Sequence, residues 1–296
     1  MTATLDGRVA VVTGAGAGLG RAEAVALATS GARIVLNDLP GAADEAADEI
    51  KALGADVALA PGDIGERATA DLIVKTALDT FGSLDIVVNN AGVTRDKMLF
   101  NMTDEEFDLV IKIHLRGHFL LSRNAAAHWK QVAKESGAPV DASVINTASE
   151  AFLTGSPGQA NYAAAKAGIT ALTLTTARGL SRIGVRANAI CPRARTAMTA
   201  EVFGEDTSGK TIDPYSADHV APLVAYLASP AASRISGQVF VVYGGMVALL
   251  AAPTVERRFD TGADIWSTDE LDKTLGGFFA DRDPEISFAA DAILSL

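Results

Sequence analysis

The stretch "RVAVVTGAGAGLGRAEA" (residues 8–24) decides the fold class, because an apolar run leads directly into four glycines within seven residues. The apolar run predicts a buried strand, and the "LGRAEAVALATSG" that follows predicts a helix. Glycines let a backbone approach a pyrophosphate closely, and the N-terminus of a helix presents free N–H groups to it. The stretch therefore predicts a strand, a loop and a helix that together bind a dinucleotide.

The same alternation continues along the chain. Further apolar runs occur at 32–38, 55–61, 84–90, 142–148, 185–191 and 238–244, separated by longer helical patterns. These runs are apolar throughout, as expected when helices cover both faces of a parallel sheet. We predict an α/β fold, a Rossmann-type doubly wound parallel sheet of seven strands. The dinucleotide-binding domain is expected at 1–254 and a C-terminal extension at 255–296, which contains a weak amphipathic helix around "STDELDKTLGGFF".

Composition narrows the function classes. The net charge of −11 argues against nucleic acid or an anionic membrane as a partner, so an anionic substrate would need a locally basic site. The single cysteine, Cys191, excludes a disulfide within the chain and fits a reducing compartment. The longest apolar run is broken by two glycines and is a poor membrane span. We expect a cytoplasmic protein with no metal site.

An acidic residue ends the second predicted strand. Asp38 follows Gly14 by 24 residues, and no Arg or Lys lies beside it in "VLNDLPGA". A carboxylate at this place accepts hydrogen bonds from a ribose 2′-OH and repels a 2′-phosphate, which favours NAD over NADP. The alternative is an ordinary capping or surface aspartate. Asp63 and the "NNAG" run at 89–92 end the next two strands, at the sheet edge where such folds bind ligands.

Three motifs in order resemble the short-chain dehydrogenase/reductase family over about residues 5–247. They are T-G-x-x-x-G-x-G from Thr13, "NNAG", and Y-x-x-x-K in "GQANYAAAKAG" at 158–168. In that family a serine precedes the tyrosine by thirteen residues, and here that position is Ser149. The resemblance implies an enzyme whose catalytic residues are Ser149, Tyr162 and Lys166.

The implied roles make physical sense. Tyr162 would exchange a proton with the substrate oxygen, although a free phenol has a pKa of about 10 and is a poor base near neutrality. We expect Lys166 and the cationic nicotinamide to lower that pKa, and Lys166 also to hold the nicotinamide ribose. Ser149 would hydrogen-bond the substrate oxygen.

His114 stands where many family members carry a fourth catalytic residue, an asparagine. The histidine lies in "VIKIHLRGHFLL" on the predicted helix after "NNAG". A neutral imidazole donates and accepts, so His114 would hold a water that links Lys166 to solvent. The alternative is a histidine that only packs in the core. His118, His128 and His219 are interpreted as structural.

Finer resemblance points to one branch. "GAGLGRA", "NNAGVTRDKM" and "IHLRGHF" look like the dehydrogenase part of peroxisomal multifunctional enzyme type 2 and bacterial 3-hydroxyacyl-CoA or 17β-hydroxysteroid dehydrogenases. This implies NAD-linked interconversion of a secondary alcohol and a ketone on an acyl-CoA or a steroid. The alternatives are an NADPH-linked 3-ketoacyl reductase, which Asp38 disfavours, and a non-catalytic dinucleotide-binding protein, which the intact Ser149–Tyr162–Lys166 set disfavours.

The polar stretch 193–215 is expected to be a loop or lid over the site. In "ICPRARTAMT", Arg193 replaces the glycine found in most of the wider family, while Thr196 and Met198 follow as in the branch. Arg193 and Arg195 would contact a phosphate of coenzyme A or of the cofactor, lie exposed in the loop, or pair with carboxylates of the tail.

The resemblance also implies a homodimer or homotetramer that pairs helices at roughly 103–135 and 161–181. The complete set of expected cofactor residues is Gly14, Gly16, Gly18, Leu19, Gly20, Asp38, Asp63, Ile64, Asn90, Ala91, Gly92, Tyr162, Lys166, Pro192 and Thr196.

Overall fold

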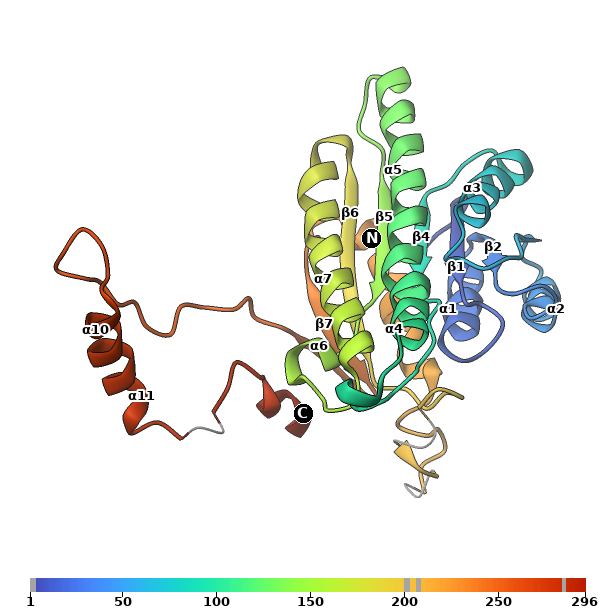
Figure 1. Cartoon of the computed structure of the whole chain (residues 1–296). Coiled ribbons are helices and arrows are strands. Elements are labelled where there is room, and N and C mark those ends of the chain that lie inside the picture. Colours follow the sequence, from blue (N-terminus) through green and yellow to red (C-terminus); the bar gives the residue numbers. More distant parts are fainter. Residues whose placement is uncertain (1–3, 200–202, 206–208, 284–285) are drawn as a thin grey trace. The chain divides into compact units, whose positions relative to one another are not determined.

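The computed structural model describes residues 4–199, 203–205, 209–283 and 286–296 (Figure 1). The chain divides into two compact units, 1–250 and 251–296, which are described separately below. The structure thus divides between 250 and 251, whereas the sequence predicted a boundary between 254 and 255.

The first unit is built on one sheet of eight strands in the order β3-β2-β1-β4-β5-β6-β7-β8. Each of the seven predicted runs contains a strand, and those seven strands pair with one another in parallel. The strands are β1 Val9–Thr13, β2 Arg33–Asn37, β3 Val57–Leu59, β4 Ile86–Asn89, β5 Ala142–Thr147, β6 Val185–Pro192, β7 Val239–Tyr243 and β8 Met246–Leu249.

The seven predicted parallel strands are confirmed, and the sheet continues beyond them at one edge. β8 adds an eighth strand, antiparallel to β7, with Tyr243 opposite Met246 across Gly244 and Gly245. The first of the two glycines, Gly244, supplies the positive φ that a two-residue hairpin needs, with a φ of +50°. The sequence "VVYGGMVAL", with two glycines between two apolar runs, therefore already indicated this hairpin.

Helices cover both faces of the sheet, and alternate residues of each strand face opposite helices. In β1, Val12 packs with Leu27 of α1 (Gly18–Thr29), whereas Val11 packs on the other face with Ile73 of α3 (Arg67–Phe81). The first face also carries α2 (Asp44–Ala52) and α9 (Ala221–Ala228), and the second also carries α5 (Gly117–Ser136) and α7 (Ala160–Leu180). Both faces are therefore buried, which explains the uniformly apolar strands.

The long helix of the second face has an irregular centre. α4 (Asp104–Ile111) continues through a π-helical turn, η2 (Lys112–Arg116), into α5, and His114 lies in that turn. α6 (Ala151–Thr154) is a single turn after β5. The 3₁₀ turns of this unit are η1 Leu99–Asn101, η3 Ser181–Ile183, η4 Ala217–His219 and η5 Pro230–Ala232.

The strand order reverses between β1 and β4. β2 lies on one side of β1 and β4 on the other, so their connections leave in opposite directions. In open α/β sheets, ligands bind in the crevice at the carboxyl ends of the strands beside such a reversal. The fold thus places the glycine loop after β1 and the "NNAG" run after β4 at one crevice.

The second unit contains the helix predicted around "STDELDKTLGGFF". It runs through α10 (Thr268–Leu271), η6 (Asp272–Gly276) and α11 (Gly277–Ala280), followed by the 3₁₀ turn η7 (Asp291–Ser295). Ser267 closes a capping box at its start. Within the parts of the chain that the structure describes, no helix has the length and apolar character to cross a membrane.

Candidate active site

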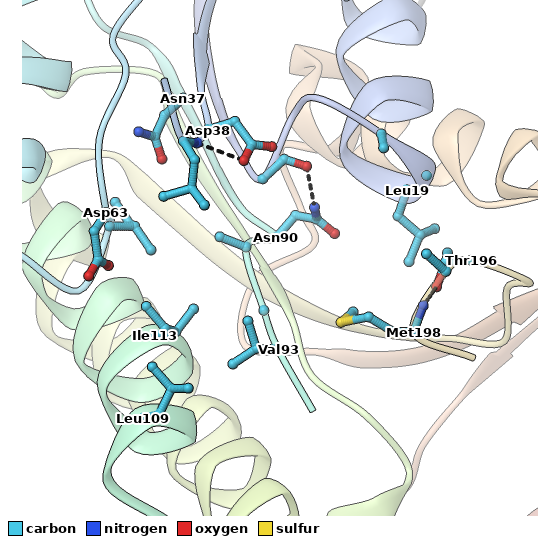
Figure 2. A pocket seen from close by; sticks show the side chains of 18 of the residues that line it. Leu19, Asn37, Asp38, Asp63, Asn90, Val93, Leu109, Ile113, Thr196 and Met198 are labelled. Carbon is cyan, nitrogen blue, oxygen red and sulfur yellow. Dashed lines mark hydrogen bonds between the residues drawn. The ribbon is translucent and has the colours of Figure 1, made fainter. Parts of the chain in front are cut away.

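A cavity of about 520 Å³ opens at the carboxyl edge of the sheet, beside the strand reversal (Figure 2). Most of the predicted cofactor residues line it: Gly14, Gly18, Leu19, Asp38, Asp63, Ile64, Asn90, Ala91, Gly92 and Thr196. Gly16, Gly20, Tyr162, Lys166 and Pro192 are not among the residues that line this cavity. Its remaining wall includes Leu109 and Ile113 of the α4–η2 segment, together with Met198.

The glycine loop lies against the end of β4. Gly14 has a left-handed φ of +63°, and a Cβ there would lie 2.8 Å from Ala91 Cα. A Cβ on Gly20 would lie 2.2 Å from the Gly14 carbonyl oxygen, so only glycine lets α1 begin this close to the loop. Ala17 caps α1 without a side-chain hydrogen bond. A backbone cradle that ends in an uncapped helix N-terminus fits a pyrophosphate.

Asp38 is held in a fixed orientation at the cavity wall. Its Oδ2 accepts a hydrogen bond from the Gly16 N–H at 2.9 Å, and its Oδ1 accepts one from the Leu39 N–H at 2.7 Å. The residue after it is an exposed leucine rather than a cation. A carboxylate aligned by two backbone donors is suited to accept hydrogen bonds from ribose hydroxyls.

The "NNAG" run is tied to the end of β1. The Thr13 hydroxyl accepts hydrogen bonds from the N–H groups of Asn90 (3.0 Å) and Ala91 (3.1 Å), and the Asn90 amide donates to the Thr13 carbonyl at 3.1 Å. Asp63 is held separately by the Lys112 ammonium at 2.9 Å. These bonds fix the two loops that form the cavity floor.

Ser149, Tyr162 and Lys166 come together at the end of β5. The Ser149 hydroxyl lies close enough to the Tyr162 phenol to lower its pKa, and the Lys166 ammonium lies 5.3 Å from the Tyr162 ring centroid. Lys166 is only 2% exposed and donates to the Thr147 carbonyl at 2.5 Å. Residues from a strand end and one helix face are thereby brought into contact.

The expected lowering of the Tyr162 pKa concerned the phenol with a bound nicotinamide, whereas the chain by itself raises that pKa. Burial raises the pKa of Tyr162 to about 12, and the nearby Ser149 hydroxyl opposes that rise. Burial also lowers the pKa of Lys166 to about 7. The ammonium points to the Thr147 carbonyl and lies over the face of the ring, so burial of the phenol dominates.

His114 contacts the same tyrosine. Its ring meets the Tyr162 ring edge-to-face at 5.3 Å, and its Nε2 lies 3.0 Å from the Val93 nitrogen and 2.8 Å from the Val93 oxygen. Burial lowers the pKa of His114 to about 3, so the imidazole is neutral. Among the described residues, its Nδ1 has no hydrogen-bond partner. The water relay through His114 stays a prediction, and the unpartnered Nδ1 is the nitrogen that such a water would bind.

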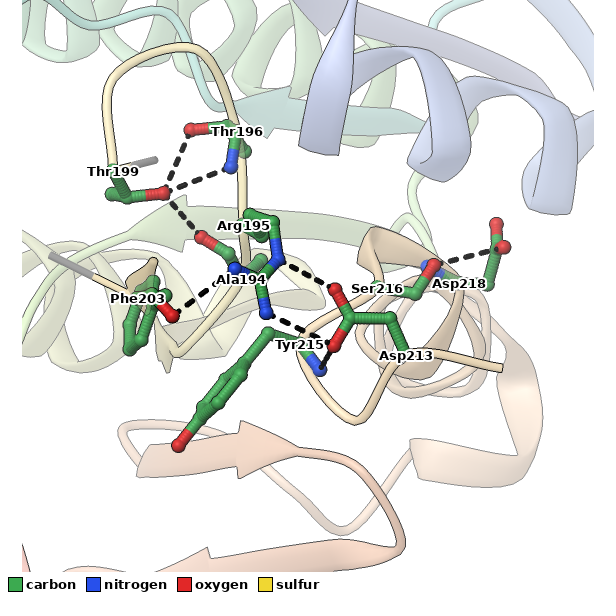
Figure 3. Close-up of polar contacts among 9 residues, drawn as sticks. All are labelled: Ala194, Arg195, Thr196, Thr199, Phe203, Asp213, Tyr215, Ser216 and Asp218. Atoms are coloured by element: carbon green, nitrogen blue, oxygen red, sulfur yellow. Dashed lines mark hydrogen bonds and ion pairs between the residues drawn. The ribbon is translucent and has the colours of Figure 1, made fainter. Parts of the chain in front are cut away.

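Arg193 and Arg195 have partners that the sequence analysis did not consider. Arg193 forms a bidentate pair with Glu150, with both N–O distances at 2.8 Å. Arg195 pairs with Asp213 at 2.7 Å (Figure 3). Both carboxylates belong to the first unit, not to the tail. Thr196 follows in the same loop, with its N–H donating to Thr199.

Sequence reasoning also missed Glu23. The residue is fully buried on α1, and neither carboxylate oxygen has a hydrogen-bond partner in the described part of the chain. Burial raises the pKa of Glu23 to about 8. Its position in the helical stripe of Gly20, Ala24 and Leu27 could have revealed this burial.

The chain matches one protein family and is similar to two enzymes of known name. The short chain dehydrogenase family profile matches residues 8–207. The chain is 58% identical to the hydroxyacyl-CoA dehydrogenase ChsB1 of Mycobacterium tuberculosis, over 99% of this chain and 95% of that protein. It is 39% identical to the peroxisomal multifunctional enzyme type 2 of Mus musculus, over 83% of this chain and 33% of that enzyme.

Two further similarities concern a reductase and a solved structure. A 3-oxoacyl-[acyl-carrier-protein] reductase of Synechocystis is 38% identical, over 83% of this chain and 99% of that protein. The crystal structure of a short chain dehydrogenase from Mycobacterium avium superposes with a TM-score of 0.86 at 40% identity. That match covers 97% of this chain and 99% of the other.

Proposed function

Because the chain belongs to the short-chain dehydrogenase family and is an oxidoreductase using a nicotinamide dinucleotide, we propose that it oxidises a 3-hydroxyacyl-CoA with NAD. The observation that carries the proposal is that Ser149, from the turn after β5, lies beside Tyr162 and Lys166, which share one face of α7. The 58% identity to a hydroxyacyl-CoA dehydrogenase supports this substrate class over a 17β-hydroxysteroid.

NAD fits the residues around the cavity. The glycine loop and the N-terminus of α1 would hold the pyrophosphate, and Asp38 would accept hydrogen bonds from the adenosine ribose. A 2′-phosphate would meet the Asp38 carboxylate and the exposed Leu39, with no compensating cation at those two positions. By the family resemblance, Tyr162 and Lys166 would hold the second ribose.

The bound nicotinamide supplies the hydride acceptor, and the protein moves the proton. Ser149 donates a hydrogen bond to the substrate oxygen, and Tyr162 takes the alcohol proton at its phenolic oxygen. Because the pKa of Tyr162 is raised to about 12 in the chain alone, oxidation should accelerate as pH rises and the phenolate fraction grows. The neutral His114 lies against the Tyr162 ring and would hold a water that exchanges protons with solvent.

The proposal is tested by measuring initial rates with NAD and NADP over a panel of 3-hydroxyacyl-CoA chain lengths and 17β-hydroxysteroids. We expect NAD-linked turnover of at least one acyl-CoA, with a higher kcat/KM than any steroid. Steroid turnover above that of every acyl-CoA would contradict the substrate assignment.

The second candidate is an NADPH-linked reductase of 3-oxoacyl groups, which the 38% identity to the Synechocystis enzyme supports. Asp38 favours the NAD-linked reaction because its carboxylate repels a 2′-phosphate. A fluorescence titration with NADH and NADPH separates the two, since tighter binding of NADPH would favour the reductase.

We also propose self-association through α5 and α7. Phe119 on α5 is 44% exposed and Leu174 on α7 is 38% exposed, which supports a covered apolar face on these helices. Light scattering should give a dimer or tetramer mass, and Phe119→Glu should lower it. A monomer mass for the unaltered chain would contradict the proposal.

A further inference from the structure

Arg193 joins three segments of the first unit. Its guanidinium forms two parallel hydrogen bonds with Glu150, and the two side chains are only 13% and 12% exposed. The same guanidinium lies 5.0 Å from the ring centroid of Tyr243, at the end of β7. The end of β6, the turn after β5 and the β7–β8 hairpin are therefore joined through one side chain.

Glu150 is the residue that follows Ser149. It caps α6, and the Ser149 hydroxyl accepts a hydrogen bond from the Ala151 N–H at 3.2 Å within the same short turn. Consecutive Cα atoms are about 3.8 Å apart, so fixing the Glu150 side chain also restricts where Ser149 can lie. A planar, two-pronged contact fixes direction as well as distance, which a lysine could not do equally well.

The surrounding rings keep Arg193 in place. Tyr243 stacks on Tyr215 at 5.6 Å, and Tyr215 stacks on Phe203 at 4.4 Å. Arg195 lies 5.9 Å from the Tyr215 ring and is fixed by Asp213 and the Phe203 carbonyl (Figure 3). The two arginines thus share one aromatic stack, but Arg193 reaches the Ser149 turn and Arg195 binds its own loop.

We propose that Arg193 is a positioning residue, which holds Ser149 through Glu150 at the place where Ser149 binds the substrate oxygen. The proposal rests on the proposed function for the role of Ser149. Removing one partner of a largely buried ion pair leaves the other charge unpaired, so Arg193→Gln should lower thermal stability as well as turnover. Arg195→Gln loses a similar pair, so comparing the two variants separates the loss of turnover from the loss of stability.

The first experiment measures kinetics in a mutant cycle on whichever secondary alcohol the enzyme oxidises. We expect Arg193→Gln to lower kcat roughly tenfold to a hundredfold, as small misplacements of active-site groups do, with NAD affinity by fluorescence titration within about twofold. In a Ser149→Ala background the same change should cost almost nothing further, since both act through one hydroxyl. An undiminished loss in that background overturns the proposal.

Arg195→Gln is the matched control, because it removes a similar ion pair from the same loop without touching Glu150. It should leave kcat within about threefold, and an equal loss of kcat would show that loop stability is responsible. The charge-swapped Arg193→Glu/Glu150→Arg variant should recover part of the lost kcat.

The second experiment does not require turnover, so it separates this proposal from the proposed function. Amide hydrogen exchange followed by mass spectrometry should be at least about threefold faster across 148–155 in Arg193→Gln, and unchanged across 13–20. Unchanged exchange at 148–155 overturns the proposal. Faster exchange together with no activity on any hydroxyacyl-CoA would contradict only the proposed function.

Discussion

The dinucleotide cavity and the interior around Tyr162 differ in how their polar groups are satisfied. At the cavity, Thr13, Asp38 and Asn90 all bond to backbone atoms of neighbouring loops. In the interior, Glu23 and the Nδ1 of His114 have no hydrogen-bond partner among the described residues. The cavity is thus a fixed shape made by backbone, whereas the interior holds ionisable groups whose charge depends on burial. Substitutions at the cavity should therefore alter cofactor affinity. Substitutions in the interior around Tyr162 should alter kcat and the pH dependence of activity or stability.

The largest effect is expected at Tyr162. Tyr162→Phe removes the proton acceptor and should lower kcat roughly a hundredfold to ten-thousandfold. NADH affinity in the fluorescence titration should fall much less, because Lys166 and the glycine loop still hold the cofactor. Tyr226→Phe, at a tyrosine 40% exposed on α9, is the control and should retain full activity. A Tyr162→Phe variant with near-normal turnover would refute the assignment of this residue.

Glu23 should make stability depend on pH. Its pKa is about 8 in the folded chain against an ordinary value of 4.5, so the folded state keeps a proton that the unfolded state releases as pH rises. Below pH 4.5 both states are protonated, and stability is lost progressively as pH rises toward 8. Glu23→Gln should remove this loss, worth roughly 3 kcal/mol between pH 5 and pH 8.

Urea unfolding at pH 5 and pH 8 measures this effect. Glu45→Gln is the control, because Glu45 has a side chain 87% exposed on the surface of α2. The interpretation fails if the free-energy difference between Glu23→Gln and the unaltered chain is the same at both pH values.

Gly14 tests the backbone cradle. Gly14→Ala introduces strain at a φ of +63° and a contact of 2.8 Å with Ala91, and should weaken NADH binding at least about tenfold. Gly82→Ala matches the strain, with a φ of +79°, but has open space around the added methyl. Equal binding by the two variants in a fluorescence titration would show that the contact with Ala91 is unimportant.

The smallest effect is expected at Asp38. Asp38→Asn keeps an acceptor oxygen but removes the charge, so NADH affinity should fall about tenfold and the preference over NADPH should narrow. Asp48→Asn, at a side chain 77% exposed, is the control. An unchanged ratio of the two dissociation constants would remove Asp38 from coenzyme selection.

The parts predictable from sequence were those that depend on local pattern. The strand positions followed from uniformly apolar runs, and the family resemblance drawn from three motifs is confirmed by the match over residues 8–207. The eighth strand could also have been predicted, since Gly244 and Gly245 separate two apolar runs. We predicted instead that the sheet ends with the strand at 238–244.

The features that the sequence did not predict depend on contacts between residues far apart in the chain. Glu150 and Arg193 are 43 residues apart and meet only because β5 and β6 are neighbours in the sheet. The π turn at 112–116 leaves no spacing signal of its own. The raised pKa of Tyr162 in the chain by itself could not be predicted, because the sequence shows that a lysine is near but not that its ammonium turns to the Thr147 carbonyl.

Cys191 has a practical consequence for spectroscopy. It is the single cysteine of the chain, it is fully buried in β6, and burial raises its pKa to about 12. Thiolate is the species that reacts with maleimides, so we expect the unaltered chain to serve as a background without reactive thiols. A cysteine introduced at Val255, which is 82% exposed, would therefore take a fluorophore at one defined position of the tail without any prior substitution.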